Sequence, residues 1–196
     1  MTNPAFLPLE PYLNQFAATG DDARSRGRFN AWGNSFPAEE VPFGKVWTVA
    51  AMDFQMPVYR DRQPDHVEAA GQFIPLPVPA DLQGLAILCC GEMGDQALSL
   101  TLHSKRGPAL AAECHAGGWL VDPSRPVDAS CLMFTHLHYP GDYELSHLCP
   151  ALWAMAVDLP EPFPLTGITL GTNPLFHIFA ITLSMGDRGH VQPERD

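Results

Sequence analysis

The sequence predicts an all-β protein, a two-sheet antiparallel β-sandwich of the jelly-roll type, with a β-barrel as the alternative fold. Its 196 residues include 20 prolines and 16 glycines, which mark many turns and leave little room for long helices. Hydrophobic residues make up 46% of the chain, which is enough for a substantial core. Short alternating or apolar runs separated by turn residues recur along the sequence, as in sandwiches and barrels.

The clearest predicted strand is 98–103, in which leucines alternate with Ser99, Thr101 and His103. Residues 85–90 form a continuous apolar run, which predicts a central strand, whereas the alternate prolines of 71–79 restrict that segment to an edge or a polyproline-like passage. A strand over 46–54 is expected to be covered on both faces. The other predicted strands are 131–139, 152–159, 165–170 and 177–183.

One domain is the default for this length. We expect an N-terminal extension over 1–28, the β-sandwich over 29–185 and a polar tail over 186–196. Residues 1–13 lack the features of a signal peptide, and no run approaches the length of a membrane span. The five cysteines are odd in number and include no CxxC pair, so reduced cysteines in a cytoplasmic protein are the simplest account.

The charge balance limits the partners. The net charge of -11 argues against nucleic acid, whose phosphates require a basic surface, and against anionic membranes. An acidic surface suits a neutral ligand or a divalent cation instead. The expected partner is a small-molecule or sugar ligand, and a second copy of the chain, in a homodimer, is a further candidate.

The segment 28–42 is the strongest candidate for ligand recognition. It is an ordered loop by its glycine and prolines, and it contains aromatic and amide side chains but hardly any aliphatic ones. Flat apolar faces beside amide donors and acceptors suit sugars or small polar ligands. The predicted ligand-binding residues, with Gln72 added from outside the loop, are Asn30, Trp32, Asn34, Phe36 and Gln72. In the alternative interpretation Trp32 and Phe36 plug the end of the sandwich, and the asparagines cap turns.

The same loop, FNAWGNSFPAEEVP at 29–42, resembles a stretch of the β-sandwich modules attached to bacterial glycoside hydrolases. PDHVEAAGQFI at 64–74, the strand and turn at 85–94, and HIFAITL at 177–183 are also similar to segments of those modules. The resemblance covers most of the chain from 29 to 183. It implies a galactose-binding-like or jelly-roll fold and a carbohydrate-binding role.

A second candidate site carries metal-ligand chemistry. In a strand, His136 and His138 project from one face and can share an ion, with Glu144 returning across the following turn. Cupin-like metal sites have a similar order of two histidines and a glutamate. The alternative is a pair of histidines on a solvated sheet face, or one hydrogen-bonded in the core.

Two further candidates are weaker. His66, between Asp65 and Glu68, has the surroundings of a general base, although packing of its ring on an aromatic residue is the favoured interpretation. One carboxylate of the adjacent Glu39 and Glu40 could ligate Ca²⁺, and the alternative is an acidic turn.

Three functions follow from these observations. The first is a carbohydrate- or small-polar-ligand-binding β-sandwich. The second is a small enzyme on the same scaffold, in which His136, His138 and His66 act on a small organic substrate, with a transition metal or by acid–base chemistry. The third is a structural or assembly protein that uses the proline-rich edge at 73–79.

Overall fold

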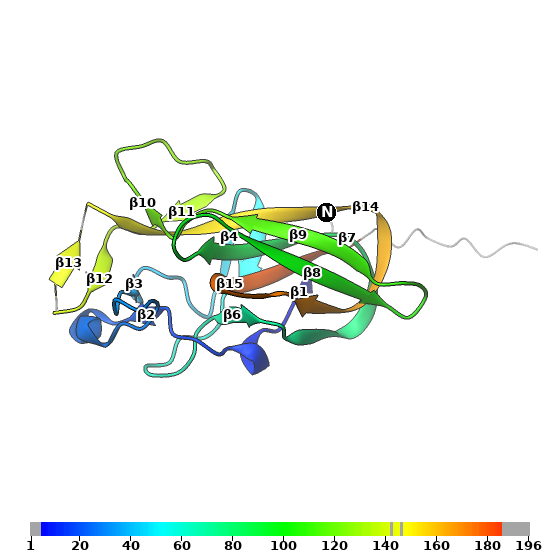
Figure 1. The fold of residues 1–196 in the computed structure, drawn as a ribbon, viewed down its shortest axis with the longest axis horizontal. Helices are drawn as coiled ribbons and strands as arrows, with labels where there is room; N and C mark the ends of the chain where they lie inside the picture. Colours follow the sequence, from blue (N-terminus) through cyan, green and yellow to red (C-terminus); the bar gives the residue numbers. More distant parts are fainter. Residues whose placement is uncertain (1–4, 142, 146, 186–196) are drawn as a thin grey trace, which may run out of the picture.

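The computed structural model describes residues 5–141, 143–145 and 147–185 and shows an almost entirely β protein (Figure 1). The short 3-10 helices are η1 (Glu10–Tyr12) and η2 (Asp21–Arg26). The strands are β1 (Ala5–Phe6), β2 (Ala18–Thr19), β3 (Phe36–Pro37), β4 (Val46–Val49), β5 (Met52–Gln55), β6 (Val67–Ala70), β7 (Phe73–Gly91), β8 (Gln96–Ser104), β9 (Leu110–Ala116), β10 (Leu120–Val121), β11 (Cys131–Met133), β12 (Leu137–Tyr139), β13 (Tyr143–Leu145), β14 (Cys149–Leu170) and β15 (Thr172–Met185). The all-β prediction is confirmed.

The main sheet has the strand order β1-β15-β7-β14-β8-β9, with β6 on β15 and β10 and β11 on β14. All of these pairings are antiparallel, as predicted. The pairs β12–β13, β2–β3 and β4–β5 lie outside it. The jelly-roll connectivity stays a prediction.

The long strands β7 and β14 differ from the short strands that the sequence predicts. β7 joins the proline-rich 73–79 to the apolar 85–90, and β14 joins 152–159 to 165–170. Register shifts between Asp158 and Phe163 and between Leu165 and Gly167 let β14 continue across irregularities. The prolines are tolerated because the start of β7 pairs only with β14, whereas β15 pairs with 82–91, so this half of β7 has the predicted edge character.

Side chains of β8 pack against β7 and β15, although β8 pairs with neither strand. Leu98, Leu100 and Leu102 therefore form one core with Ile87 of β7 and Ile181 of β15, and the alternation predicted for 98–103 is confirmed. The sheet thus folds over itself into two layers. This burial explains the continuous apolar run at 85–90, which is covered on both faces.

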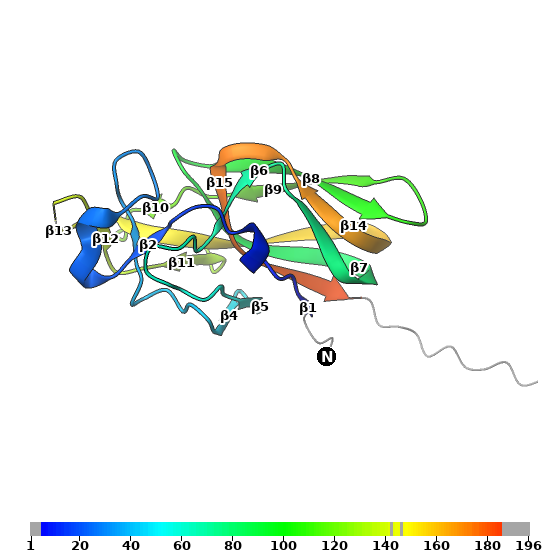
Figure 2. The same cartoon turned by 90° about the horizontal axis from the view of Figure 1, so that it is seen from below.

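A second core covers the opposite face of β7 and positions the candidate sites. It packs Leu88 of β7 and Phe179 of β15 against Phe29, Phe36 and Trp119 from the surrounding loops. Both views place β12, β2 and η2 at the same end of the molecule (Figures 1 and 2). The N-terminal residues belong to the same folded unit, because β1 pairs with β15 and β2 pairs with β3.

The predicted strand over 46–54 is wrong, because the chain reverses within it. β4 and β5 form a hairpin with Val49 paired to Met52, and Ala50 and Ala51 occupy the turn with φ of 50° and 63°. Two positive φ values are typical of a type I′ turn, which usually carries Asn-Gly. Alanine gives no such signal, so the turn cannot be recognised from the sequence.

We expect Ala51→Gly to raise the free energy of unfolding by about 0.5–1 kcal/mol, because glycine removes the Cβ strain of the left-handed conformation. Urea unfolding of the variant measures this change. Ala97→Gly is the matched control: Ala97 lies exposed within β8, where glycine is expected to destabilise by about 0.5–1 kcal/mol. Equal effects of the two substitutions would contradict the assignment of strain to Ala51.

The predicted strand over 131–139 is also interrupted. β11 pairs with β14 in the main sheet, whereas β12 pairs with β13 outside it, and 134–136 connect them. His138 therefore lies in a strand, but His136 precedes it. The five cysteines are all unpaired, as predicted for reduced thiols.

Candidate metal centre and neighbouring sites

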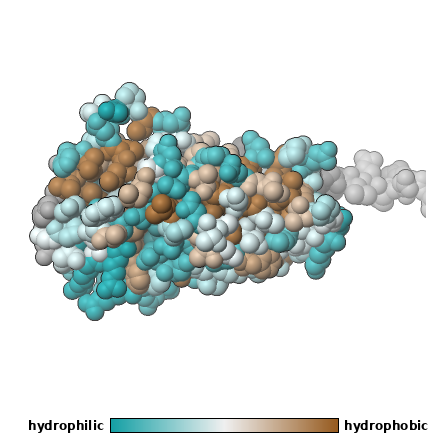
Figure 3. Space-filling view, in the orientation of Figure 1, coloured by the Kyte–Doolittle hydropathy of each residue, from teal (hydrophilic) through white to brown (hydrophobic). Residues whose placement is uncertain are grey.

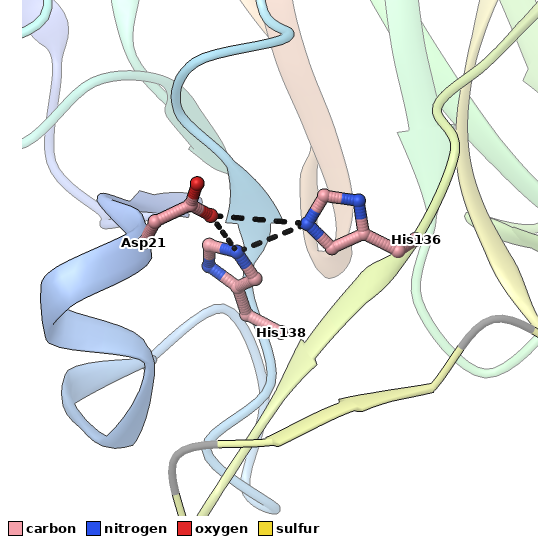
Figure 4. A group of neighbouring side chains, drawn as sticks. All are labelled: Asp21, His136 and His138. Carbon is pink, nitrogen blue, oxygen red and sulfur yellow. Dashed lines mark hydrogen bonds and ion pairs between the residues drawn. The ribbon is translucent and has the colours of Figure 1, made fainter.

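Asp21, His136 and His138 bring three potential metal-ligand atoms together (Figure 4). The Nε2 atoms of the two histidines are 3.3 Å apart. Asp21 Oδ1 lies 3.1 Å from Nε2 of His138 and 3.9 Å from Nε2 of His136. All three ligand atoms are within 4.8 Å of one another, so one cation could contact them all.

The other ring nitrogens of the two histidines are held by oxygen atoms. His136 Nδ1 lies 3.2 Å from Glu40 Oε1, and Glu40 also accepts hydrogen bonds from the backbone and hydroxyl of Thr135. His138 Nδ1 lies 2.9 Å from Thr19 Oγ1, which in turn contacts Ser35 Oγ at 2.6 Å. Such partners orient the imidazole rings and leave the Nε2 atoms directed at the shared position.

The electrostatics favour a neutral histidine beside a charged carboxylate. Burial lowers the pKa of His138 and outweighs its hydrogen bond with Asp21, so the ring is neutral at pH 7. Burial alone would raise the pKa of Asp21, but hydrogen bonds from Arg24 and His138 outweigh it and lower the pKa. The Arg24 guanidinium lies 3.2 Å from Asp21 Oδ1. A neutral imidazole and an ionised carboxylate are the forms that bind metal.

Three parts of the chain position this cluster. Asp21 opens η2, His138 lies in β12, and backbone hydrogen bonds between Ser35 and His138 attach β12 to the loop before β3. The His138 side chain is fully buried, whereas that of Asp21 is 53% exposed. The cluster is therefore anchored on one side and open to solvent on the other.

The sequence indicates the two histidines but not Asp21. Asp21 is more than a hundred residues away in a polar, turn-like segment, and nothing in that segment distinguishes it from a solvated acid. Glu144 is the carboxylate that the sequence predicts; its backbone pairs with His138 across β12 and β13, and its side chain lies outside the described structure. Its role as a ligand stays a prediction.

The two glutamates proposed for calcium accept hydrogen bonds from the chain itself. Glu39 Oε1 accepts from the Asp21 backbone N–H at 3.0 Å, and Glu40 accepts from Thr135 and lies against His136. Calcium requires a set of six to eight oxygen ligands, and these contacts supply donors instead. Glu40 is a partner of the histidine cluster, and we do not assign calcium to it.

The aromatic loop is held by an asparagine turn. Asn30 Oδ1 accepts hydrogen bonds from the backbone N–H groups of Trp32 and Asn34, both at 3.1 Å, and Gly33 adopts a φ of 75°. Asn30 therefore has the turn-capping role of the alternative interpretation. Trp32 is 55% exposed, so it does not plug the sandwich.

Two predicted ligand-binding residues are corrected by their positions. Phe36 is fully buried and packs edge-on against Phe29 and Phe134, so no face of its ring is free for a ligand. Gln72 bridges the Ala70 N–H and the Glu68 carbonyl between β6 and β7, so its amide closes that turn. Phe36 is placed by hydrophobic packing, and Gln72 by hydrogen bonds to nearby backbone groups.

His66 belongs to a buried hydrogen-bonded chain and not to an open site. Its Nδ1 lies 2.9 Å from Asp65 Oδ1, and its Nε2 lies 2.9 Å from His177 Nδ1. The ring is fully buried and stacks on Phe179, as the favoured interpretation expected, so we assign it no catalytic role. His177 Nε2 is the last atom of this hydrogen-bonded series and lies 3.6 Å from Glu92 Oε2.

No helix of the described residues is long and apolar enough to cross a membrane. No curated protein matches the chain. Residues 4–187 match the family model of the AziU2-like β-sandwich domain. This match supports the predicted β-sandwich module, whereas an attachment to glycoside hydrolases stays a prediction. Because the match covers nearly the whole sequence, the chain belongs to the AziU2-like β-sandwich domain family.

Proposed function

We propose that this protein binds one divalent transition-metal ion through Asp21, His136 and His138, and that the bound ion acts on a small organic substrate. The observation that carries the proposal is the convergence of two Nε2 atoms and a carboxylate oxygen on one position. Two imidazoles and one carboxylate suit iron, cobalt, nickel or zinc.

The proton arrangement around the histidines allows a cation to replace one proton at this position. The Thr135 hydroxyl donates to Glu40, so His136 Nδ1 faces two oxygen acceptors and is the ring nitrogen that donates. The Nε2 lone pair of His136 then faces Nε2 of His138 at 3.3 Å. That contact requires either a proton on His138 or a shared cation. A metal ion would replace the proton and satisfy both rings and Asp21.

The number of ligands favours chemistry over a purely structural ion. Structural zinc sites have four protein ligands, whereas catalytic sites have three and keep a position open for water or substrate. Asp21 provides the solvent-exposed side on which such positions would lie. The protein ligands bind and orient the ion, and Glu40 holds His136 in the required tautomer.

A titration with Co²⁺ tests the proposal, since its visible spectrum reports coordination directly. We expect one equivalent to bind, and His138→Ala to weaken binding by more than about 100-fold, because removal of a ligand exceeds the effect of removing an outer partner. Glu40→Gln is expected to weaken binding by about 10–100-fold, because it releases the His136 ring.

His115→Ala is the matched control, since His115 is an exposed histidine that also contacts a carboxylate, Glu113, at 3.0 Å. It should bind Co²⁺ as the wild type does, and circular dichroism should show that every variant is folded. Glu144→Gln tests the remaining sequence prediction in the same titration. Absence of stoichiometric binding, or equal affinities of His138→Ala and His115→Ala, would refute the metal centre.

Binding of a carbohydrate or small polar ligand is a second candidate function. The observation that favours it is the exposure of Trp32 on a loop fixed by Asn30. Tyr139 lines the same groove as Trp32 and follows His138 directly in β12, so this candidate site lies on the opposite face of β12 from the metal centre. Failure of the metal titration would leave this candidate intact.

A further inference from the structure

An open groove lies between the aromatic loop and the turn that follows β7. Its volume is about 410 Å³, which is within the range of small-molecule pockets. Trp32, Trp119 and Tyr139 contribute aromatic rings, and Leu120 and Met93 add apolar surface. Hydrophobic residues gather on the surface at the end of the molecule where β10 and β12 lie (Figure 3).

No charged side chain of the described residues lines this groove, although the chain as a whole has a net charge of -11. A charged ligand would therefore enter a site that has no opposite charge to compensate its lost hydration. The lining favours a neutral ligand.

The groove also contains a polar group that lacks a partner. Asn34 lines it and is 94% buried, since only 6% of the residue is exposed, and its Oδ1 has no hydrogen-bond partner among the described residues. A buried amide oxygen without a donor has lost its hydration and gained no hydrogen bond in return. The oxygen itself is buried, so a ligand reaches it only after rotation about the Cβ–Cγ bond, which has a broad energy minimum. A ligand N–H would supply the missing hydrogen bond.

The other amide side chain of the groove, Asn30, has its oxygen occupied by the backbone N–H groups of Trp32 and Asn34. A sugar presents several hydroxyl groups and needs several free partners. This groove offers aromatic faces and, in Asn34 Oδ1, one amide oxygen that has no hydrogen-bond partner among the described residues. A flat ring with a single donor matches it better than a sugar does.

We propose that the groove between Trp32, Asn34 and Trp119 binds a neutral, flat aromatic ring that carries an amide N–H donor. The ring stacks on the indole of Trp32, and the N–H donates to Asn34 Oδ1. Trp32 is suited to this role because the hydrogen bonds of Asn30 fix its backbone while its side chain remains exposed. The site is distinct from the metal centre and does not depend on it.

Benzamide is the probe for this site, and three compounds serve as its comparison set. N,N-dimethylbenzamide keeps the ring but lacks the donor, benzoate replaces the amide with a charge, and D-galactose represents sugars. Nuclear magnetic resonance of the labelled wild-type protein follows the side chains of Asn34 and Trp32. We expect saturable shifts with benzamide and binding about fivefold to tenfold weaker with N,N-dimethylbenzamide, the value of one hydrogen bond.

Trp32→Ala should weaken benzamide binding by about fivefold, since an aromatic pair contributes about 0.5–1.5 kcal/mol. Phe73→Ala is the matched control, because Phe73 is a similarly exposed aromatic residue outside the groove. No saturable shift, or equal binding of benzamide and N,N-dimethylbenzamide, would overturn the proposal. Tighter binding of D-galactose than of benzamide in this groove would replace the aromatic amide with a sugar.

Discussion

Asp65→Ala is expected to lower the free energy of unfolding by about 3–5 kcal/mol, the cost of breaking a buried charge network. The carboxylate of Asp65 is almost completely buried and accepts hydrogen bonds from the backbone N–H groups of Ala17 and Ala18, at 2.7 and 2.9 Å, and from His66. Alanine would leave three buried donors without acceptors.

The loss should also reach beyond the loop that carries Asp65. Ala17 directly precedes β2 and Ala18 is its first residue, and the Ala17 carbonyl accepts from the Phe36 N–H at 2.8 Å. Asp65 thus ties the N-terminal segment to the second core. Urea unfolding at pH 7 measures the change, with Asp81→Ala, an exposed aspartate of β7, as the control. A loss no larger than that of the control would contradict this role.

Acid should destabilise the protein through His177. Burial, together with the neighbouring His66, lowers the pKa of His177 from 6.5 to about 3. The unfolded chain therefore binds a proton between pH 6.5 and about 3 that the folded chain does not bind. The stabilisation is fully present above pH 6.5 and is lost as the pH falls, by about 1.4 kcal/mol per pH unit. Between pH 7 and pH 5 the expected loss is about 2 kcal/mol.

The structure explains why His177 resists protonation. If Asp65 accepts the Nδ1 proton of His66, then His66 Nε2 accepts from His177 Nδ1, and only Nε2 of His177 remains for a further proton. That atom has no hydrogen-bond partner among the described residues and lies 3.6 Å from Glu92. Burial, with a smaller contribution from Glu68, raises the pKa of Glu92. As the pH falls, Glu92 therefore becomes neutral sooner than a free glutamate does, and it then favours protonation of His177 less than an ionised carboxylate would.

His177→Asn isolates the effect, because asparagine keeps a polar atom near the position of Nδ1 but does not titrate. We expect the variant to be less stable at pH 7. Its free energy of unfolding should also change less between pH 7 and pH 5, because the slope against pH loses the contribution of about one proton. Urea unfolding at several pH values in this window measures both curves. His138 and Glu92 also titrate with shifted pKa values, but they are present in both proteins. Parallel curves for the two proteins would refute the assignment.

The sequence predicts well those strands whose hydrophobic pattern shows whether one face or both faces are buried. The strand at 98–103 and the central run at 85–90 bury their apolar residues as expected, because a strand either has one buried face or two. The hairpin at Ala50 and Ala51 is missed, because alanine in a left-handed conformation is imposed by the pairing of β4 with β5. The local sequence does not encode that conformation.

The candidate metal centre also combines residues that the sequence indicates with residues that it does not. His136 and His138 are close in sequence, so any extended or turned segment keeps them near each other, and their proximity is predictable. Asp21 joins them only because η2 packs beside β12, and Glu40 because its loop reaches Thr135. These contacts span about a hundred residues, and no local pattern indicates them.

The sequence by itself determined that this is an all-β protein with a large core, an acidic surface and a conspicuous aromatic loop. Composition and hydrophobic periodicity act locally and along each strand, so they are readable one segment at a time. The tertiary structure decided which polar side chains meet. It buried Phe36 and His66, placed Asp21 beside two histidines, and left the side-chain oxygen of Asn34 without a hydrogen-bond partner among the described residues. The physical reason is that burial and hydrogen-bond satisfaction depend on segments distant in the chain, which only the packed sheet brings together.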